Sequence, residues 1–358
     1  RPARGMLYNV RYIGIEIQDI NERSIMRIIE EYINGQFYSS PIFDEYFGGL
    51  DIVVADIETT GLSPKNSAVI LGGAVFSDGA DRKAVQFFGD TTDDEAELLQ
   101  RYTQLLSRAD VIVTYNGQRF DIPFLVHRMK KHGLDTAPIE KLYSVDMYRV
   151  LKYHSHLPEI LPNMKQKTVE VFLGDSESRT DEIDGAQSVE LYKEYTRSTG
   201  ARRGEILDYI LLHNRDDIVR LSDMMRIIKT LDLHEIMYSS GFPMTIGETD
   251  IHIEKMKISK GKLAAEGSVK GDPSGYTCFG DTSELQIDEK DGSLKLEIMC
   301  DEINEYTVAD LRPLNADIKS LQELGGYESG YLILKSGKDV RHHEANLLVR
   351  TVLYNMLG

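Results

Sequence analysis

The sequence predicts an α/β layer fold with a mixed sheet, followed by a separate antiparallel α+β domain. Between about Leu50 and Leu233, apolar runs of strand length alternate with amphipathic runs of helical length, which is typical of α/β layers. Beyond about residue 236, short alternating segments are separated by turns that contain Gly or Asp, which indicates an antiparallel sheet. A chain of 358 residues is long enough for two such domains.

We expect three segments along the chain. Residues 1–49 should form an N-terminal helical extension, because apolar residues recur at helical spacing over 21–34: Ile25, Ile28, Ile29 and Tyr32. Residues 50–235 should form strands over 52–58, 68–77, 83–89 and 111–116, and helices over 94–109, 122–132, 187–196 and 203–230. Residues 236–358 should form a β-rich domain with a hairpin turn over 288–295 and a closing helix over 344–356.

Composition excludes several classes of protein. The chain is 41% hydrophobic and 28% charged, as ordinary globular proteins are. It has no apolar run of membrane-spanning length and no signal-peptide core near residue 1. Cys278 and Cys300 are too few for a disulfide framework or a zinc cluster. We therefore expect a reduced, cytoplasmic protein with no membrane partner.

The charge balance opposes one further function. The formal net charge is −17, and binding to nucleic acid is driven mainly by neutralisation of phosphate. Charge alone therefore argues against a nucleic-acid protein. Specific motifs would have to overturn that expectation.

The first such motif is VADIETTGL (54–62), in which an apolar strand presents Asp56 and Glu58. Strand side chains alternate, so both carboxylates project from the same face. Two carboxylates that close need a compensating cation, and a divalent metal is the usual one. The alternative is an edge strand whose acids face solvent, which the flanking apolar run and the turn behind Glu58 disfavour.

Two further segments carry acidic residues at matching places. In VTYNGQRFDIPFL (113–125) a strand ends and Asp121 opens a helix, where a simple capping role is the alternative. In YILLHNRDDIVRL (209–221), His213 and Asp217 share one helical face, and the alternative is a surface pair. We include Asp121 with Asp56 and Glu58 as a candidate metal ligand, because the three motifs occur together.

These segments resemble the motifs of the DEDD superfamily of 3′–5′ exonucleases, the DnaQ-like branch of the ribonuclease-H-like fold. DIETTGL (56–62) is similar to the first motif, NGQRFD (116–121) to the second, and HNRDD (213–217) occupies the place of the third. The resemblance covers residues 50–233. Asp146 in SVDMYRVLK, the segment 161–174 and Leu191–Tyr192 are similar to a narrower branch, the prokaryotic ribonuclease-H-like predicted exonucleases.

His213 departs from the family pattern. One DEDD class has Tyr four residues before the last Asp, and another has His five residues before it. Here a His stands four residues before Asp217, and Tyr209 lies too far back to match. The resemblance carries over the four carboxylates directly, whereas His213 matches the pattern of neither class.

The resemblance implies a metal-dependent mechanism. Asp56, Glu58, Asp121 and Asp217 would bind two divalent cations, Mg²⁺ or Mn²⁺, with Asp56 bridging both. One ion would hold the attacking hydroxide and the other would stabilise the leaving 3′ oxygen. His213 would orient or deprotonate the water, since an imidazole suits a general base near neutral pH. The product would be a nucleoside 5′-monophosphate.

Substrate contacts are expected around these motifs. The turn at Thr59, Gly61 and Leu62 would touch the terminal nucleotide. The other candidates are aromatic, amide and basic side chains, each with core packing or solvated surface as its alternative: Tyr115, Asn116, Phe120, Lys165 and Lys167. The expected partner is nucleic acid with a free 3′ end, single-stranded or short.

Rival functions remain open from the sequence. The chain could be a catalytically silent nucleic-acid-binding module on the same fold, a nuclease of very short oligonucleotides, or an endonuclease of RNA–DNA hybrids. The role of residues 236–358 is unassigned; they offer a surface for protein partners or for oligomerisation. His342 and His343, before the closing helix, fit a helix-cap region and a ligand pair equally well.

Overall fold

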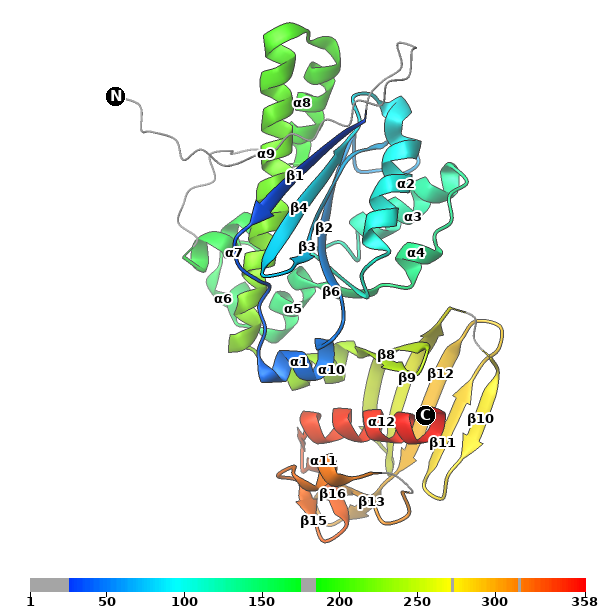
Figure 1. Ribbon diagram of the computed structural model, residues 1–358. Coiled ribbons are helices and arrows are strands. Elements are labelled where there is room, and N and C mark those ends of the chain that lie inside the picture. Colours follow the sequence, from blue (N-terminus) through cyan, green and yellow to red (C-terminus); the bar gives the residue numbers. More distant parts are fainter. Residues whose placement is uncertain (1–25, 175–184, 272–273, 315–316) are drawn as a thin grey trace. The chain divides into compact units, whose positions relative to one another are not determined.

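The computed structural model describes residues 26–174, 185–271, 274–314 and 317–358 (Figure 1). The chain divides into two compact units. The first joins the chain up to Ser39 with Gly49–Ile227, and the second joins Ser40–Gly48 with Ile228–Gly358. The second unit therefore takes in a short segment that the sequence analysis grouped with the N-terminal extension.

The first unit is built on a six-stranded mixed sheet in the order β1-β4-β3-β2-β5-β6. Strands β1 to β4 pair antiparallel, and β2, β5 and β6 run parallel. Their bounds are β1 (Arg27–Ile33), β2 (Ile52–Thr59), β3 (Val69–Asp78), β4 (Asp81–Phe88), β5 (Val111–Thr114) and β6 (Tyr143–Asp146). The four strands expected from 52 to 116 are all present, and β2 lies inside the sheet.

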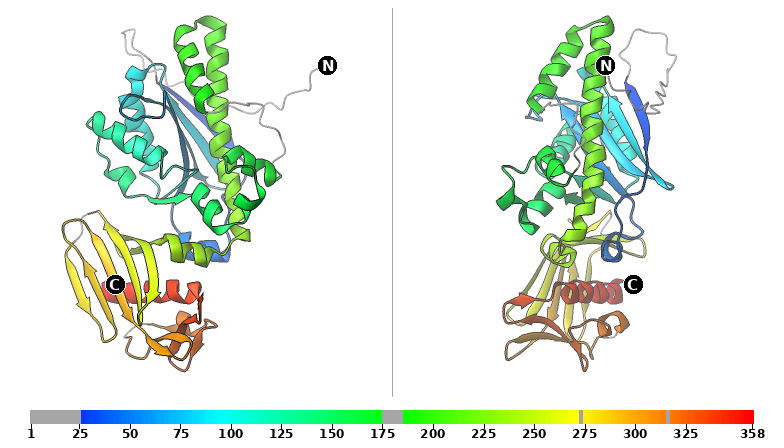
Figure 2. Two further views of the ribbon diagram at one scale, coloured as in Figure 1. Left: turned by 180° about the vertical axis from the view of Figure 1, so that it is seen from behind. Right: turned by 90° about the vertical axis from the view of Figure 1, so that its left-hand side faces the viewer.

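Helices cover both faces of this sheet (Figures 1 and 2). On one face, α2 (Glu95–Leu106) and α3 (Asp121–Lys131) pack against alternate residues of β2, among them Val53 and Ile57. On the other face, α8 (Gly185–Arg197) and the long α9 (Gly200–Met224) pack against β3 and β4. The remaining helices of this unit are η1 (Thr92–Asp94), α4 (Ala137–Glu140), α5 (Met147–His154), α6 (Leu157–Ile160) and α7 (Gln166–Phe172), and η2 (Met225–Thr230) follows α9.

The expected helix over 21–34 is wrong for the described residues, because Arg27–Ile33 forms strand β1, paired antiparallel with β4. Residues 21–25 lie outside the described part of the chain. The helical spacing of the isoleucines was coincidental. Ile28 packs into the cluster beneath α2, and its neighbour Ile29 packs into the cluster beneath α9, as strand residues facing opposite sides do.

Strand β2 extends beyond its parallel neighbour. Its pairing with β5 covers Ile52, Val53 and Val54, whereas its pairing with β3 continues to Thr59. From Ala55 onwards, the edge of β2 on the β5 side is therefore not paired with β5. This stretch lies at the carboxyl end of the parallel pair. Such ends are where α/β sheets usually place their binding sites.

The second unit contains two antiparallel sheets. One has the order β10-β11-β12-β9-β8-β7, and the other β13-β14-β16-β15 with β17 beside β16. The strands are β7 (Phe242–Ile246), β8 (Thr249–Ser259), β9 (Lys262–Lys270), β10 (Tyr276–Phe279), β11 (Ser283–Ile287), β12 (Ser293–Met299), β13 (Asp301–Ile303), β14 (Tyr306–Asp310), β15 (Tyr327–Glu328), β16 (Tyr331–Ser336) and β17 (Asp339–Val340). The expected hairpin turn joins β11 to β12.

Among the described residues, four helices accompany these sheets: α1 (Pro41–Phe47), α10 (Leu233–Ser240), α11 (Lys319–Gln322) and α12 (His342–Leu357). The closing helix expected over 344–356 is thus present as α12, and His342 and His343 form its first turn. Both cysteines are free thiols. In the described part of the chain, every helix is too short or too polar to serve as a bilayer crossing.

Candidate active site

Asp56 and Glu58 project from β2 toward α8 and α9. Their neighbours Val53, Ala55 and Ile57 belong to the apolar cluster on the opposite face, so the alternation of the strand separates core from site. Asp56 accepts a hydrogen bond from α9, and Glu58 accepts one from α8. Since β2 is a central strand, the edge-strand alternative is excluded.

Asp121 is the first residue of α3 and reaches back to β2. Its Oδ1 accepts a hydrogen bond of 3.2 Å from the backbone N–H of Ile57, the residue between Asp56 and Glu58. This N–H lies beyond the end of the β2–β5 pairing. A helix cap alone would not make this contact, so the position of Asp121 is defined by the sheet as well as by its own helix.

His213 and Asp217 complete the group from one face of α9. His213 Nε2 lies 3.6 Å from Glu58 Oε1 and 3.5 Å from Asp217 Oδ2. One ligand atom from each of the three residues lies within 4.8 Å of the others. His213 is 7% exposed, so the alternative of a surface pair is wrong.

The carboxylates are close enough to disturb one another's ionisation. Burial, together with the charges of Asp121, Asp217 and Glu58, raises the pKa of Asp56 well above its usual range. Burial and the charges of Glu58 and Asp146 raise the pKa of Asp121 to about 7, against the effect of the Ile57 hydrogen bond. Like charges held together in this way fit a cation site, and oxygen donors fit a hard divalent cation.

Three side chains that sequence reasoning missed hold the carboxylates in place. Asn214 Nδ2 donates to Asp56 Oδ2 at 2.9 Å, and Gln86 Nε2 donates to Asn214 Oδ1 at 2.9 Å. Ser188 Oγ donates to Glu58 Oε2 at 2.7 Å, and both side chains are buried. Asn214 stands inside the HNRDD motif, but Gln86 and Ser188 lie in unrelated segments, and no local pattern marks them.

Asp146 organises the loop before α3. It accepts backbone hydrogen bonds from Asn116 at 2.8 Å and Gln118 at 3.3 Å, and it caps α5 through Tyr148 N. Asn116 has a φ of 65°, in the left-handed region where Asn is one of the tolerated residues. Asn116 therefore has a structural part in the turn.

The turn after β2 divides into internal and exposed residues. Thr59 is buried, and its Oγ1 donates to the carbonyl of Gly61 at 2.9 Å. Leu62 is 87% exposed. Within this turn, Leu62 is the side chain most available to a ligand, while Thr59 stabilises the turn itself.

The other expected substrate residues differ in placement. Phe120 is half-buried against the α2–α3 cluster and packs on Phe124, which favours its core-packing alternative. Tyr115 is half-buried and donates to Met164 O at 2.6 Å. Lys165 is exposed and Lys167 half-buried at the start of α7. Gln166, between the two lysines, donates to the carbonyl of Asp217 at 2.9 Å, so α7 adjoins the carboxylates.

A buried cluster of charged side chains holds the segment that follows the turn after β2. Glu95 accepts from Arg128 Nε at 2.7 Å, from Val69 N at 2.8 Å and approaches His132 Nε2 at 2.7 Å. Arg128 also donates to the carbonyl of Pro64 at 3.0 Å. The cluster thus fixes both ends of the segment from Pro64 to Val69.

The family comparison agrees with this architecture. Residues 53–229 match the family model described as the ribonuclease H (RNase_H) superfamily. Over this segment the chain is similar to the RNase H superfamily. The matched residues span the whole site, from β2 to the end of α9, and the prediction of a ribonuclease-H-like mixed sheet flanked by helices is confirmed.

The other similarities cover only part of this chain and of each relative. DNA polymerases of Thermococcus litoralis and Thermococcus aggregans are 40% and 38% identical over 47 residues, which is 13% of this chain and only 3% of each polymerase. The family B DNA polymerase of Pyrobaculum calidifontis covers 57% of this chain over 28% of its own, at 19% identity and a TM-score of 0.39. Exonuclease I covers 61% over 55% of its own, at 13% identity and a TM-score of 0.31.

Proposed function

We propose that the chain is a metal-dependent 3′–5′ exonuclease that hydrolyses single-stranded DNA or RNA to nucleoside 5′-monophosphates. The observation that carries the proposal is the gathering of four carboxylates and His213 from three distant segments, β2, α3 and α9. Such a constellation inside an RNase H segment supports nuclease chemistry.

Asp56, Glu58, Asp121 and Asp217 would hold two divalent cations, Mg²⁺ or Mn²⁺. When bound, the ions would supply positive charge that polarises the phosphate and promotes ionisation of water. The raised pKa values of Asp56 and Asp121 support this fit, because a cation would relieve the repulsion that raises them.

His213 would act on the attacking water. Its Nε2 faces Glu58 and Asp217, so a water near those two carboxylates would lie within reach of the same nitrogen. Nε2 would accept the proton as the water attacks phosphorus, and the two carboxylates would keep the imidazole oriented. The burial of His213 limits its rotation, which favours a fixed geometry for this proton transfer.

The substrate would be a short or single-stranded 3′ end. A net charge of −17 gives weak electrostatic attraction for a long polyanion, so binding would depend on the metal ions and on local contacts. Leu62 is available to pack against a terminal base, and Lys165 to contact a phosphate. Tyr115, Asn116 and Lys167 would border the same strand.

Degradation of labelled strands tests the proposal. Single-stranded DNA and RNA, labelled at the 3′ or the 5′ end, are incubated with Mg²⁺ or Mn²⁺. We expect immediate release of 3′ label as mononucleotide and a ladder from the 5′ label. A dinucleotide in parallel separates a nuclease of very short substrates from one that degrades long strands.

Two substitutions tie the activity to the site. Asp217→Asn should abolish metal-dependent hydrolysis, whereas Asp208→Asn, at an exposed carboxylate of the same helix, should not. Full hydrolysis by Asp217→Asn would refute the assignment. Strand binding by the wild type without hydrolysis in any metal would instead identify a silent binding module.

A further inference from the structure

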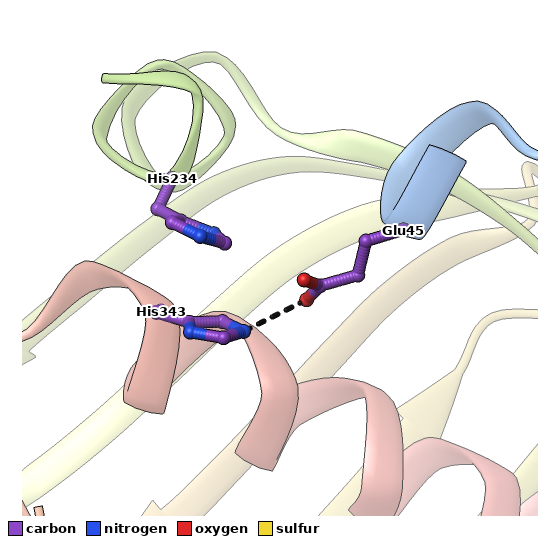
Figure 3. A group of neighbouring side chains, drawn as sticks. All are labelled: Glu45, His234 and His343. Carbon is purple, nitrogen blue, oxygen red and sulfur yellow. Dashed lines mark hydrogen bonds and ion pairs between the residues drawn. The ribbon is translucent and has the colours of Figure 1, made fainter. Parts of the chain in front are cut away.

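A second group of metal-ligand side chains lies in the other unit of the chain and includes none of the proposed nuclease residues (Figure 3). Glu45 comes from α1, His234 from α10 and His343 from α12. One ligand atom from each residue lies within 4.8 Å of the others, and all three residues are half-buried. Three helices that are far apart in the sequence thus bring these side chains close to one another.

We propose that Glu45, His234 and His343 form a zinc site. Two imidazoles and one carboxylate are a ligand set that zinc accepts, with water or a substrate atom in the fourth position. Mixed nitrogen and oxygen donors favour zinc over Mg²⁺, which prefers oxygen donors alone. The zinc site shares no residue with the proposed nuclease centre, and the zinc proposal does not depend on the proposed nuclease function.

The hydrogen bonds around His234 leave one ring nitrogen for an ion. Tyr46 OH lies 2.7 Å from His234 Nδ1, so Nε2 is the nitrogen that remains for a metal. Asn346 Nδ2 donates both to Tyr46 OH at 2.8 Å and to the carbonyl of His234 at 2.9 Å. Partners of this kind fix ring orientation in metal sites.

His343 is the ligand that has to move. The rings of His234 and His343 are stacked, with centroids 3.8 Å apart and planes 19° apart. Nitrogen lone pairs lie in the ring planes, so nearly parallel rings cannot both point at one ion. His343 is 33% exposed and is held by a 3.0 Å hydrogen bond to Glu45, itself a ligand, so its rotation exchanges that bond for a shared metal.

Glu45 is held from its backbone side. Arg350 Nη1 donates to the Glu45 carbonyl at 2.6 Å and lies 4.0 Å from Glu45 Oε1. The carboxylate is 25% exposed, so solvent can reach the fourth position of a bound ion. One carboxylate and two neutral imidazoles would leave the bound ion partly uncompensated, which favours an anionic or water-derived fourth ligand.

Zinc binding to the full chain tests the inference. Protein stripped with a chelator is dialysed against Zn²⁺ in excess Mg²⁺, and bound zinc is measured per chain. We expect His234→Ala and His343→Ala to lose one zinc equivalent relative to the wild type. His156→Ala is the matched control, because His156 is 87% exposed and belongs to none of the metal-ligand groups of the described residues.

The carboxylate centre can also take zinc, so the two sites have to be distinguished. Asp217→Asn should lower zinc at that centre and leave the Glu45 site filled. Co²⁺ in place of zinc should give visible absorption bands that His343→Ala removes and Asp217→Asn keeps. Loss of nuclease activity would leave these results unchanged, so this inference and the proposed function fail separately.

Two further variants distinguish loss of the zinc site from loss of the fold. Glu45→Gln keeps the shape of the side chain and should lose the zinc equivalent while far-ultraviolet circular dichroism stays unchanged. Tyr46→Phe should weaken zinc affinity about 10-fold, as loss of an outer partner does. Wild-type zinc content in His343→Ala and Glu45→Gln would overturn the inference and identify the group as a hydrogen-bonded stack only.

Discussion

Asn214 Nδ2 donates a hydrogen bond of 2.9 Å to Asp56 Oδ2, which links the middle of α9 to the centre of β2. Asn214 is fully buried, and its own carbonyl oxygen accepts from Gln86 in β4. The amide can therefore present its nitrogen to Asp56 in one orientation only. Asp56 is held by a neutral donor that does not compete with a cation for its charge.

Asn214→Ala should lower kcat about 10–100-fold, the usual effect of losing an outer partner of a metal ligand. The Asp56 carboxylate would lose its fixed orientation, and Gln86 would lose its acceptor. We expect KM for the nucleic acid to change little and the Mn²⁺ concentration needed for half-maximal rate to rise. Asn355→Ala, at an exposed position of the second unit, should match the wild type in both measurements.

Gly73→Ala should disrupt the same hydrogen bond from the opposite side. A Cβ at Gly73 would lie 2.1 Å from Asn214 Oδ1, in a buried place where neither residue can give way. We expect a loss of about 1–3 kcal/mol in the free energy of unfolding, typical of overpacking, with activity falling as for Asn214→Ala. Gly204→Ala on α9 meets no atom within 4 Å, so denaturant unfolding should show it at least as stable as the wild type.

Leu62→Ala separates binding from stability. The side chain is 87% exposed, so its loss should change the free energy of unfolding by less than about 0.5 kcal/mol. If Leu62 packs against the terminal base, KM for a single strand should rise several-fold while kcat stays within a factor of about two. Ile160→Ala, at a side chain 61% exposed on α6, is the control, and equal KM values for the two variants would count against this contact.

Glu95 should make the first unit sensitive to acid. Burial by itself would raise the pKa of Glu95, but hydrogen bonds from Arg128, His132 and the backbone of Val69 outweigh it and hold that pKa below its usual range. A carboxylate with a lowered folded pKa stabilises fully above its unfolded value, about 4.3 for Glu, and the contribution is lost as pH falls through the folded pKa.

Glu95→Gln removes this contribution at neutral pH. The side chains of Glu95 and Arg128 are 1% and 5% exposed, and breaking such a buried pair costs about 3–5 kcal/mol. Urea unfolding at pH 7 should show that difference, and the gap between the variant and the wild type should narrow below about pH 4. Arg101 and Glu97, an exposed pair on α2, provide the control: Glu97→Gln should give a gap near zero at either pH.

The proposed ligands were predictable because each follows from a local rule. Alternation along a strand places Asp56 and Glu58 on one face, and helical spacing pairs His213 with Asp217. Their convergence could be inferred only from the resemblance of the three motifs taken together. The hydrogen bond from Ile57 to Asp121 had no local signal, because it depends on where β5 stops pairing with β2.

The errors and omissions have a common physical cause. The isoleucines of β1 fit a helical period, but pairing with β4 determined the outcome, and no property of residues 27–33 alone identifies that partner. Gln86 stands in an apolar strand and Ser188 in a helix of mixed composition, and neither is distinctive until tertiary packing brings it to Asn214 or Glu58. Support for a site is a long-range property, whereas its ligands sit in recognisable motifs.

The hydrogen bond from Ile57 N to Asp121 Oδ1 gives the Asp121 side chain two roles. The carboxylate stands where a further strand residue would otherwise accept the N–H, so it completes the sheet as well as the proposed ion site. A descendant of this chain that abandoned its chemistry would still need a short side chain with an oxygen at position 121. The proposed ion site needs the negative charge of Asp121, whereas the hydrogen bond from Ile57 needs only an oxygen acceptor. Asp121→Asn removes the charge and keeps the acceptor, so it is the substitution that such a descendant could accept first.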